Sequence, residues 1–84
     1  MTRIDGDLDL AAVPHWLARA DELAGSDTLD LAGVRRVDSA GISLLLELSR
    51  RARASGRALA LTRAPQRLRT LANFLGIGSL LSFD

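Results

Sequence analysis

Residues 29–42 read LDLAGVRRVDSAGI, and this stretch decides the fold of the 84-residue chain. Leu29 and Leu31 alternate with polar or small neighbours, which is the pattern of a short strand with one buried face. Gly33 then opens a turn, and we expect residues 34–37 to form a loop. The stretch therefore predicts a strand that ends shortly before a helix begins, as in the repeating units of an α/β fold.

A long helix is expected after this strand and loop. Asp38 and Ser39 both favour the N-cap of a helix, and we expect Ser39 to cap one backbone N–H through its hydroxyl. They are followed by apolar residues at helical spacing: Ile42, Leu44, Leu45, Leu46 and Leu48. The helix is expected to run to about Ser55, where Gly56 ends it. Because the apolar stripe is wide, we expect burial against a sheet and one neighbouring element.

The start of this helix is the candidate functional feature. The first N–H groups of a helix lack intrahelical partners and carry a partial positive charge. Gly41 removes a side chain near that end, so we expect another surface to approach closely there. From these residues alone, two simpler interpretations of the helix start remain open. It is either a capped helix end whose glycine relieves crowding, or a site that binds an anion. The chain has no lysine and neither a GxGxxG nor a P-loop pattern, which argues against a nucleotide site.

The rest of the chain alternates strand and helix patterns. Strands are expected over residues 4–8 and 58–62, and helices over residues 11–24 and 65–75. The apolar tail, residues 77–83, is expected to pack back onto the domain. The resulting order of strand and helix, three times repeated, predicts a small sheet with parallel pairs and helices packed on it.

Composition excludes several classes of function. The chain has no cysteine and one histidine, His15, so neither a metal cluster nor a hydrolytic triad is expected, and no cofactor. The formal charge is only +1, although all eleven basic residues are arginine, which argues against a nucleic-acid partner. No apolar run approaches the roughly 20 residues of a membrane span, so we expect a cytoplasmic chain without direct membrane insertion. The length predicts a single domain over residues 1–84.

Two further sets of residues are expected to be structural. Trp16 lies on the helical face of residues 11–24 that also carries the apolar side chains, so we expect it in the core. The arginines at the end of the long helix are expected to form a solvated face near its negative end: Arg50, Arg51, Arg53 and Arg57.

Two motifs resemble the STAS family, the sulfate-transporter and anti-sigma-factor-antagonist domains. Residues 6–9, GDLD, are similar to that family's GELD strand end. Asp30-Leu31 followed by residues 37–42, VDSAGI, and a leucine-rich helix resembles its central motif. The resemblance extends from about Arg3 to Leu81 and implies a STAS-like fold, a mixed or parallel sheet covered by helices. The family usually has one more strand before Ile4, and we expect that strand to be absent here.

Two kinds of small STAS protein compete within this resemblance. Anti-sigma-factor antagonists carry a phosphorylated hydroxyl at the second residue after the motif aspartate, where this chain has Ala40. The MlaB-type subunit of phospholipid-trafficking ABC transporters has a small residue there, and residues 36–41, RVDSAG, are similar to it. This resemblance implies a protein that binds and stabilises or regulates the transporter's ATPase subunit, peripheral to the inner membrane. The alternative is an antagonist that binds a serine-kinase anti-sigma factor, with Ser39 as its phosphorylation site.

We therefore expect a non-catalytic binding protein. The residues expected to contact the partner are Arg35, Arg36, Asp38, Ser39, Ala40, Gly41, Ile42, Ser43 and Glu47. Gly41 is expected to permit close approach, and Ser39 to offer a polar group. On this hypothesis Ser39→Glu or Gly41→Arg leaves the fold intact and abolishes the complex. A catalytic or nucleotide-binding α/β domain is the remaining rival, and the lack of lysine, cysteine and a second histidine disfavours it.

Overall fold

The computed structural model describes residues 2–84 and shows an α/β arrangement of short parallel strands and helices. The strands are β1 (Thr2–Arg3), β2 (Gly6–Leu8), β3 (Thr28–Asp30), β4 (Val34–Val37), β5 (Ala60–Thr62) and β6 (Ser82–Phe83). The helices are α1 (Val13–Leu17), α2 (Ala20–Ala24), α3 (Ser39–Ala54), α4 (Gln66–Phe74) and the 3-10 turn η1 (Gly78–Leu80).

The strands form two parallel sheets. The larger has the order β1-β3-β5-β6, and the smaller pairs β2 with β4. In the larger sheet Leu29 of β3 lies opposite Leu61 of β5, and both side chains are fully buried. Within the described residues β1 and β6 are the edge strands. The expectation that the family's first strand is absent is not tested by this arrangement and stays a prediction.

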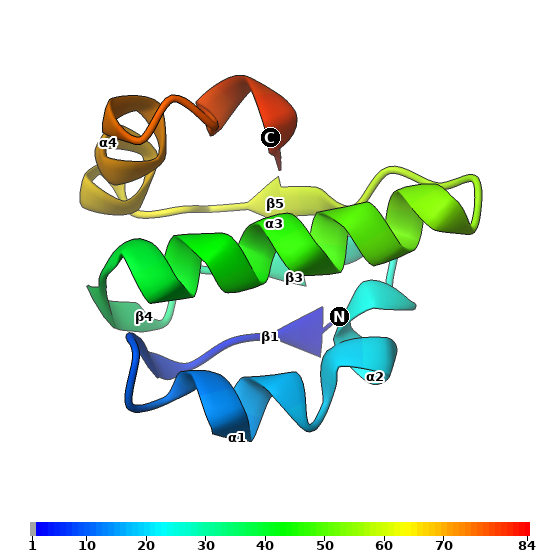
Figure 1. Ribbon diagram of the computed structural model, residues 1–84, viewed down its shortest axis with the longest axis horizontal. Helices are drawn as coiled ribbons and strands as arrows, with labels where there is room; N and C mark the ends of the chain where they lie inside the picture. The colour runs from blue at the N-terminus through cyan, green and yellow to red at the C-terminus, as the bar shows by residue number, and fades with distance from the viewer. Residues whose placement is uncertain (1) are drawn as a thin grey trace.

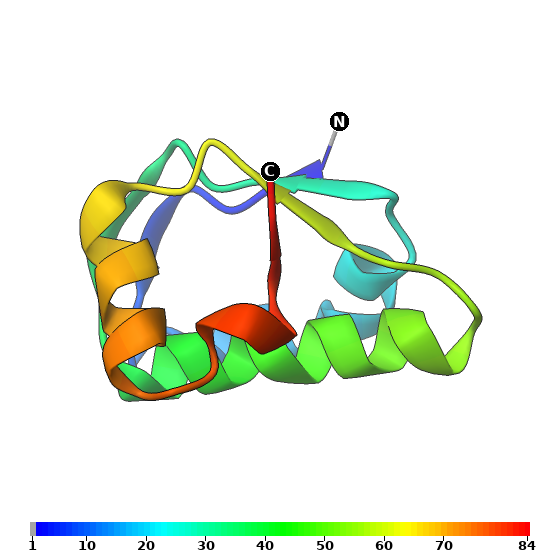
Figure 2. The same cartoon turned by 90° about the horizontal axis from the view of Figure 1, so that it is seen from above.

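All the helices lie on one face of the larger sheet (Figure 2). The long helix α3 crosses this face, with α1 and α2 along one side and α4 along the other (Figure 1). The core lies between the two layers and is almost entirely leucine, isoleucine and alanine. Its largest fully buried apolar side chains are Ile4, Leu8, Leu23, Leu29, Leu31, Ile42, Leu45, Leu48, Leu59, Leu61 and Leu68. The predicted fold class is confirmed, and the sheets prove to be parallel throughout.

The strand predicted over residues 4–8 is two strands. The chain bends at Gly6, whose φ of +94° lies in the left-handed region that only glycine adopts easily. Because of this bend, β1 pairs with β3 whereas β2 pairs with β4. The Ile4 amide still donates to the Asp30 carbonyl oxygen at 3.1 Å, so the sheet continues into the bend.

The helix predicted over residues 11–24 is likewise divided. It stops after Leu17 and starts again at Ala20, and Arg19 at the break has φ and ψ of −108° and 17°. Leu17 is consequently exposed, whereas Trp16 and Ala20 are buried. Trp16 lies in the core as predicted, and its indole Nε1 donates to the Asp7 carbonyl oxygen at 2.9 Å.

The loop predicted over residues 34–37 is wrong, because this segment is strand β4. Val34 lies opposite Gly6, and Val37 lies opposite Leu8, with a register shift between the two pairs. That irregularity lets two consecutive arginines face solvent between the valines, so the alternation that marks a strand is lost from the sequence. The strand brings the chain directly to the start of α3.

The C-terminal half follows the predictions closely. Pro65, the predicted first residue of this helix, is its N-cap, so α4 starts one residue later, and Gly76 follows its end with a φ of +78°. The tail packs back as expected, since Leu81 is buried and β6 pairs with β5. Among residues 2–84 we find no helix with the length and hydrophobicity that crossing a bilayer requires.

Candidate functional site

Asp38 caps the N-terminus of α3. Its Oδ1 accepts the Gly41 backbone N–H at 3.1 Å, and its Oδ2 accepts the Leu10 backbone N–H at 2.9 Å. Its backbone N–H lies 3.4 Å from the Leu8 carbonyl oxygen. One carboxylate thus joins the helix start to the turn between β2 and α1. The Leu10 hydrogen bond is the main reason that the Asp38 pKa lies below its usual 3.8, against the opposing effect of burial.

Ser39 is therefore not the cap that we predicted. It is the first residue of α3, and its side chain is exposed. Within residues 2–84 its hydroxyl makes no hydrogen bond, because the carboxylate of Asp38 already accepts from the first turn. The hydroxyl is left free to meet another molecule.

Gly41 does not face solvent, and this corrects the role predicted for it. A Cβ atom at this position would overlap the Leu8 carbonyl oxygen and lie 2.7 Å from the carbonyl carbon. The absent side chain lets α3 pass against the backbone at the end of β2. Ile42 is also fully buried. Neither residue can contact a partner, so the expectation that Gly41→Arg would leave the fold intact is wrong.

Leu10 is a residue that the sequence analysis missed. The Asp38 hydrogen bond holds its backbone against the start of α3, and its side chain is 70% exposed. A large exposed leucine whose backbone is fixed to the start of a helix is more typical of a binding surface than of a solvated turn. We call Leu10, Ser39, Ala40 and Ser43 the α3 N-terminal surface. Ser39 and Ser43 are exposed and one helical turn apart, and Ala40 is half-buried.

No pocket opens in the surface formed by residues 2–84. The α3 N-terminal surface is thus a shallow face with short side chains and one leucine. Such a face suits contact with another macromolecule better than enclosure of a small ligand.

The model of the family described as "Mlab, STAS domain" matches residues 1–82. The chain belongs to the STAS family. A solved structure of the anti-sigma factor antagonist SpoIIAA in its unphosphorylated form is similar, with a TM-score of 0.71 and 23% sequence identity. The match covers 98% of this chain and 76% of that one, and at this identity it shows the shared fold. No curated protein matches the chain. STAS domains are in general binding domains and not catalysts.

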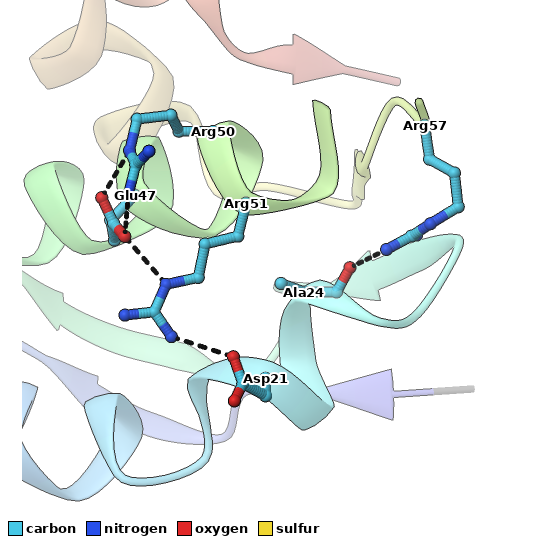
Figure 3. A network of polar contacts seen from close by, with 6 residues as sticks. All are labelled: Asp21, Ala24, Glu47, Arg50, Arg51 and Arg57. Atoms are coloured by element: carbon cyan, nitrogen blue, oxygen red, sulfur yellow. Dashed lines mark hydrogen bonds and ion pairs between the residues drawn. The ribbon is translucent and has the colours of Figure 1, made fainter. Parts of the chain in front are cut away.

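Glu47 belongs only partly to the exposed stripe of the STAS domain's helix α3. Its carboxylate accepts hydrogen bonds from Arg50 at 2.9 and 2.7 Å and from Arg51 at 2.8 Å, and its side chain is 30% exposed (Figure 3). The Arg50 hydrogen bonds, followed by that of Arg51, lower its pKa to about 2. Because the guanidinium groups already occupy its oxygens, Glu47 is poorly placed to contact a partner. Its predicted contact role stays a prediction.

The arginines near the end of α3 hold α2 in place. Arg51 also donates to Asp21, at 3.1 Å, and Arg57 donates to the Ala24 carbonyl oxygen, at 2.6 Å (Figure 3). Arg57 donates as well to the Ser26 carbonyl oxygen, at 3.1 Å. Asp21 is exposed, so its ion pair contributes little to stability. The two carbonyl contacts instead satisfy the C-terminal end of α2, where unpaired carbonyls gather. The solvated face that we predicted thus holds for the exposed Arg50 and Arg53, whereas Arg51 and Arg57 are half-buried and contact the α2 segment.

Arg35 and Arg36 are both exposed on β4, immediately before the helix start, where the sequence analysis expected contact residues. Asp30 forms an ion pair that no local pattern of the sequence indicates. Asp30 is only 1% exposed, and its carboxylate accepts from the Ala32 amide and from the Arg63 guanidinium. The Arg63 hydrogen bonds are the main reason that the Asp30 pKa is lowered. Arg63 has a φ of +54°, and we infer that this ion pair compensates for an unfavourable backbone angle.

We expect the STAS domain to lose stability in acid. Asp38 and Glu47 have folded-state pKa values below the unfolded values of 3.8 and 4.5. Each such carboxylate stabilises the folded state. Its contribution is complete above its pKa in the unfolded chain and is lost as the pH falls through its pKa in the folded protein. Urea unfolding should therefore show a lower midpoint at pH 3 than at pH 7.

The neutral variant Asp38→Asn tests the contribution of this carboxylate. It keeps one accepting oxygen, so it should fold, but the drop in urea midpoint from pH 7 to pH 3 should be smaller than in the wild type. An unchanged drop would mean that Asp38 gains nothing from its contacts on folding.

Proposed function

We propose that this STAS domain is a cytoplasmic accessory protein that binds the ATPase subunit of an ABC transporter for phospholipid trafficking. It stabilises or regulates that subunit at the inner membrane, to which it is peripheral through the complex. The observation that carries the proposal is the α3 N-terminal surface, where the backbone of the exposed Leu10 is bonded to the Asp38 cap and the next residue, Ser39, has an exposed hydroxyl group. The description of the matching family model, "Mlab, STAS domain", supports this choice of partner.

Ala40 favours the transporter partner over an anti-sigma factor. It stands at the position where antagonists carry the phosphorylated hydroxyl, and alanine cannot accept a phosphate. The half-buried methyl group of Ala40 instead forms part of the α3 N-terminal surface.

The direct test is complex formation. The chain and the ATPase subunit of the same organism's phospholipid-trafficking transporter are co-expressed with a tag on one of them only. We expect the pair to co-purify in a fixed ratio, and the ATPase subunit to be more resistant to heat in the complex than alone. Separate elution of the two proteins at micromolar concentration would contradict the proposal.

Leu10→Asp is expected to weaken this complex about 30-fold, which corresponds to roughly 2 kcal/mol for a buried apolar anchor. The free variant should be as stable as the wild type, because the leucine side chain is exposed. The binding measurement is isothermal titration calorimetry. Leu80→Asp is the matched control, since Leu80 is also exposed but lies in η1, outside the α3 N-terminal surface. Equal loss of affinity in both variants would argue against a specific role for Leu10.

A second candidate function rests on the free hydroxyl of Ser39. In this function the chain binds a serine-kinase anti-sigma factor, which phosphorylates Ser39. The N-terminus of a helix tolerates a phosphate at that position. The test is incubation with such a kinase and ATP, followed by intact mass measurement. A gain of one phosphate on the wild type, absent from Ser39→Ala, would favour this candidate.

A further inference from the structure

Three arginines near the start of α3 have no carboxylate partner among the described residues. Of the chain's eleven arginines, those in ion pairs within residues 2–84 are Arg3, Arg19, Arg50, Arg51 and Arg63. Arg35 and Arg36 are exposed on β4, and Arg67 is exposed in the first turn of α4. The three positive charges lie on neighbouring elements, because Arg67 donates to the carbonyl oxygens of Val34 and Arg35.

These contacts fix the position of one guanidinium. Arg67 Nη2 lies 3.0 Å from the Val34 carbonyl oxygen and also bonds the Arg35 carbonyl oxygen. Arg35 turns toward β2, since its Nη2 lies 3.9 Å from where a Cβ atom of Gly6 would stand. A guanidinium has five N–H donors, so Arg67 keeps donors free after these bonds. We call Arg35, Arg36 and Arg67 the β4 arginine cluster.

The carboxylates that could neutralise the cluster are engaged elsewhere or form no ion pair with it. Asp38 accepts from two backbone amides, Asp30 from Arg63, and Asp5 from Arg3. Asp7 on β2 forms no ion pair with the cluster within residues 2–84. The cluster therefore carries excess positive charge directly beside the helix start, although the whole chain has a formal charge of only +1.

We propose that the β4 arginine cluster binds an acidic segment of the ATPase subunit. The carboxylates of that segment accept hydrogen bonds from the guanidinium groups of the cluster. The inference rests on the proposed function and adds the chemistry of the partner's contact face. Arginine forks match carboxylates in paired hydrogen bonds, and Arg67 is already held in place. A small cluster on a nearly neutral chain lacks the extended positive field that polyanions or anionic bilayers need, which favours a protein partner.

The test is the affinity for the ATPase subunit, measured by titration calorimetry between 50 and 500 mM NaCl. The charge-reversed variant Arg35→Glu/Arg36→Glu should bind about 30-fold more weakly at low salt, and its affinity should vary less with salt than that of the wild type. Arg35→Gln/Arg36→Gln, which removes the charge with less effect on folding, should show a smaller loss in the same direction. Arg53→Glu is the matched control, because Arg53 is exposed near the other end of α3, where it donates to the Leu80 carbonyl oxygen.

The outcomes separate the inference from the proposed function. If the wild type binds and both cluster variants bind equally well, the inference is wrong and the proposed function stands. If the wild type does not bind the ATPase subunit at all, both are wrong. Vesicles of phosphatidylcholine with 30% phosphatidylglycerol serve as a further probe. Retention of the wild type on these vesicles, lost in the double variants while their ATPase affinity is unchanged, would overturn the inference in favour of a membrane contact.

Discussion

Gly41→Ala is expected to destabilise the fold by about 3 kcal/mol, the upper part of the range for overpacking a core. The added methyl group would overlap the Leu8 carbonyl oxygen and lie 2.9 Å from Leu8 Cγ. The atoms that must yield are backbone atoms at the end of β2, so no side-chain rotation removes the clash. The measurement is urea or thermal unfolding. For a chain of this length the expected loss corresponds to a fall in Tm of at least about 12 °C.

Gly56→Ala is the matched control for this experiment. Gly56 follows α3, has a φ of +78°, and would place no Cβ within 4 Å of another atom. Its substitution should cost only about 1 kcal/mol, the strain of the left-handed backbone. If the two variants lose equal stability, or if Gly41→Ala unfolds like the wild type, the close contact between α3 and β2 is wrong.

Ser39→Glu is expected to abolish binding to the ATPase subunit without harming the fold. Ser39 is exposed at the first position of α3, where a negative charge is favoured by the helix dipole by about 0.3–1 kcal/mol. In the complex the longer, charged side chain would be buried against a partner surface that fits the short serine side chain. We expect affinity to fall at least 100-fold, or about 2.7 kcal/mol, with an unchanged or slightly higher urea midpoint.

Ser79→Glu provides the comparison. Ser79 is exposed as well, but it lies in η1 beyond α4. Its variant should bind like the wild type. If Ser39→Glu binds like the wild type, Ser39 is not part of the contact surface. If the variant loses both binding and folding, the loss of binding is explained by lost stability and Ser39 has no shown role in the contact.

The sequence sufficed for the alternation of strand and helix regions and for the long helix. The wide apolar stripe and the Asp38-Ser39 pair predicted the two ends of α3 to within one residue, because helix capping and helical periodicity depend on neighbouring residues. The predicted loop before it is strand β4, because a register shift exposes two adjacent arginines and hides the alternation. Local patterns cannot show which distant strand will supply a partner, and β4 is defined by its pairing with β2.

The predicted contact residues stay a prediction, but the structure changes the roles of several residues around the start of α3. Asp38 could be identified as a cap, yet its second hydrogen bond to Leu10 joins residues 28 positions apart and leaves no local signal. Leu10 therefore went unnoticed. Gly41 was assigned to the outer face because spacing alone does not say which side of a helix meets the sheet, and the side is set by β2.

The same contacts explain why the α3 N-terminal surface has its shape. The Asp38 carboxylate accepts the Gly41 amide of the first turn, and the exposed Ser39 hydroxyl stands at the helix start. Gly41 brings α3 onto β2, and the turn that follows β2 places the Leu10 backbone against the Asp38 carboxylate. Stability and the proposed binding thus involve different faces of the same helical turn.

Amide hydrogen exchange of the chain, alone and with the ATPase subunit, tests the central claim most directly. We expect added protection in residues 10–12 and 35–43, which include the β4 arginine cluster's strand and the α3 N-terminal surface. Residues 77–84 should exchange at the same rate in both states. Protection confined to η1 and β6, with none at the start of α3, would contradict the account.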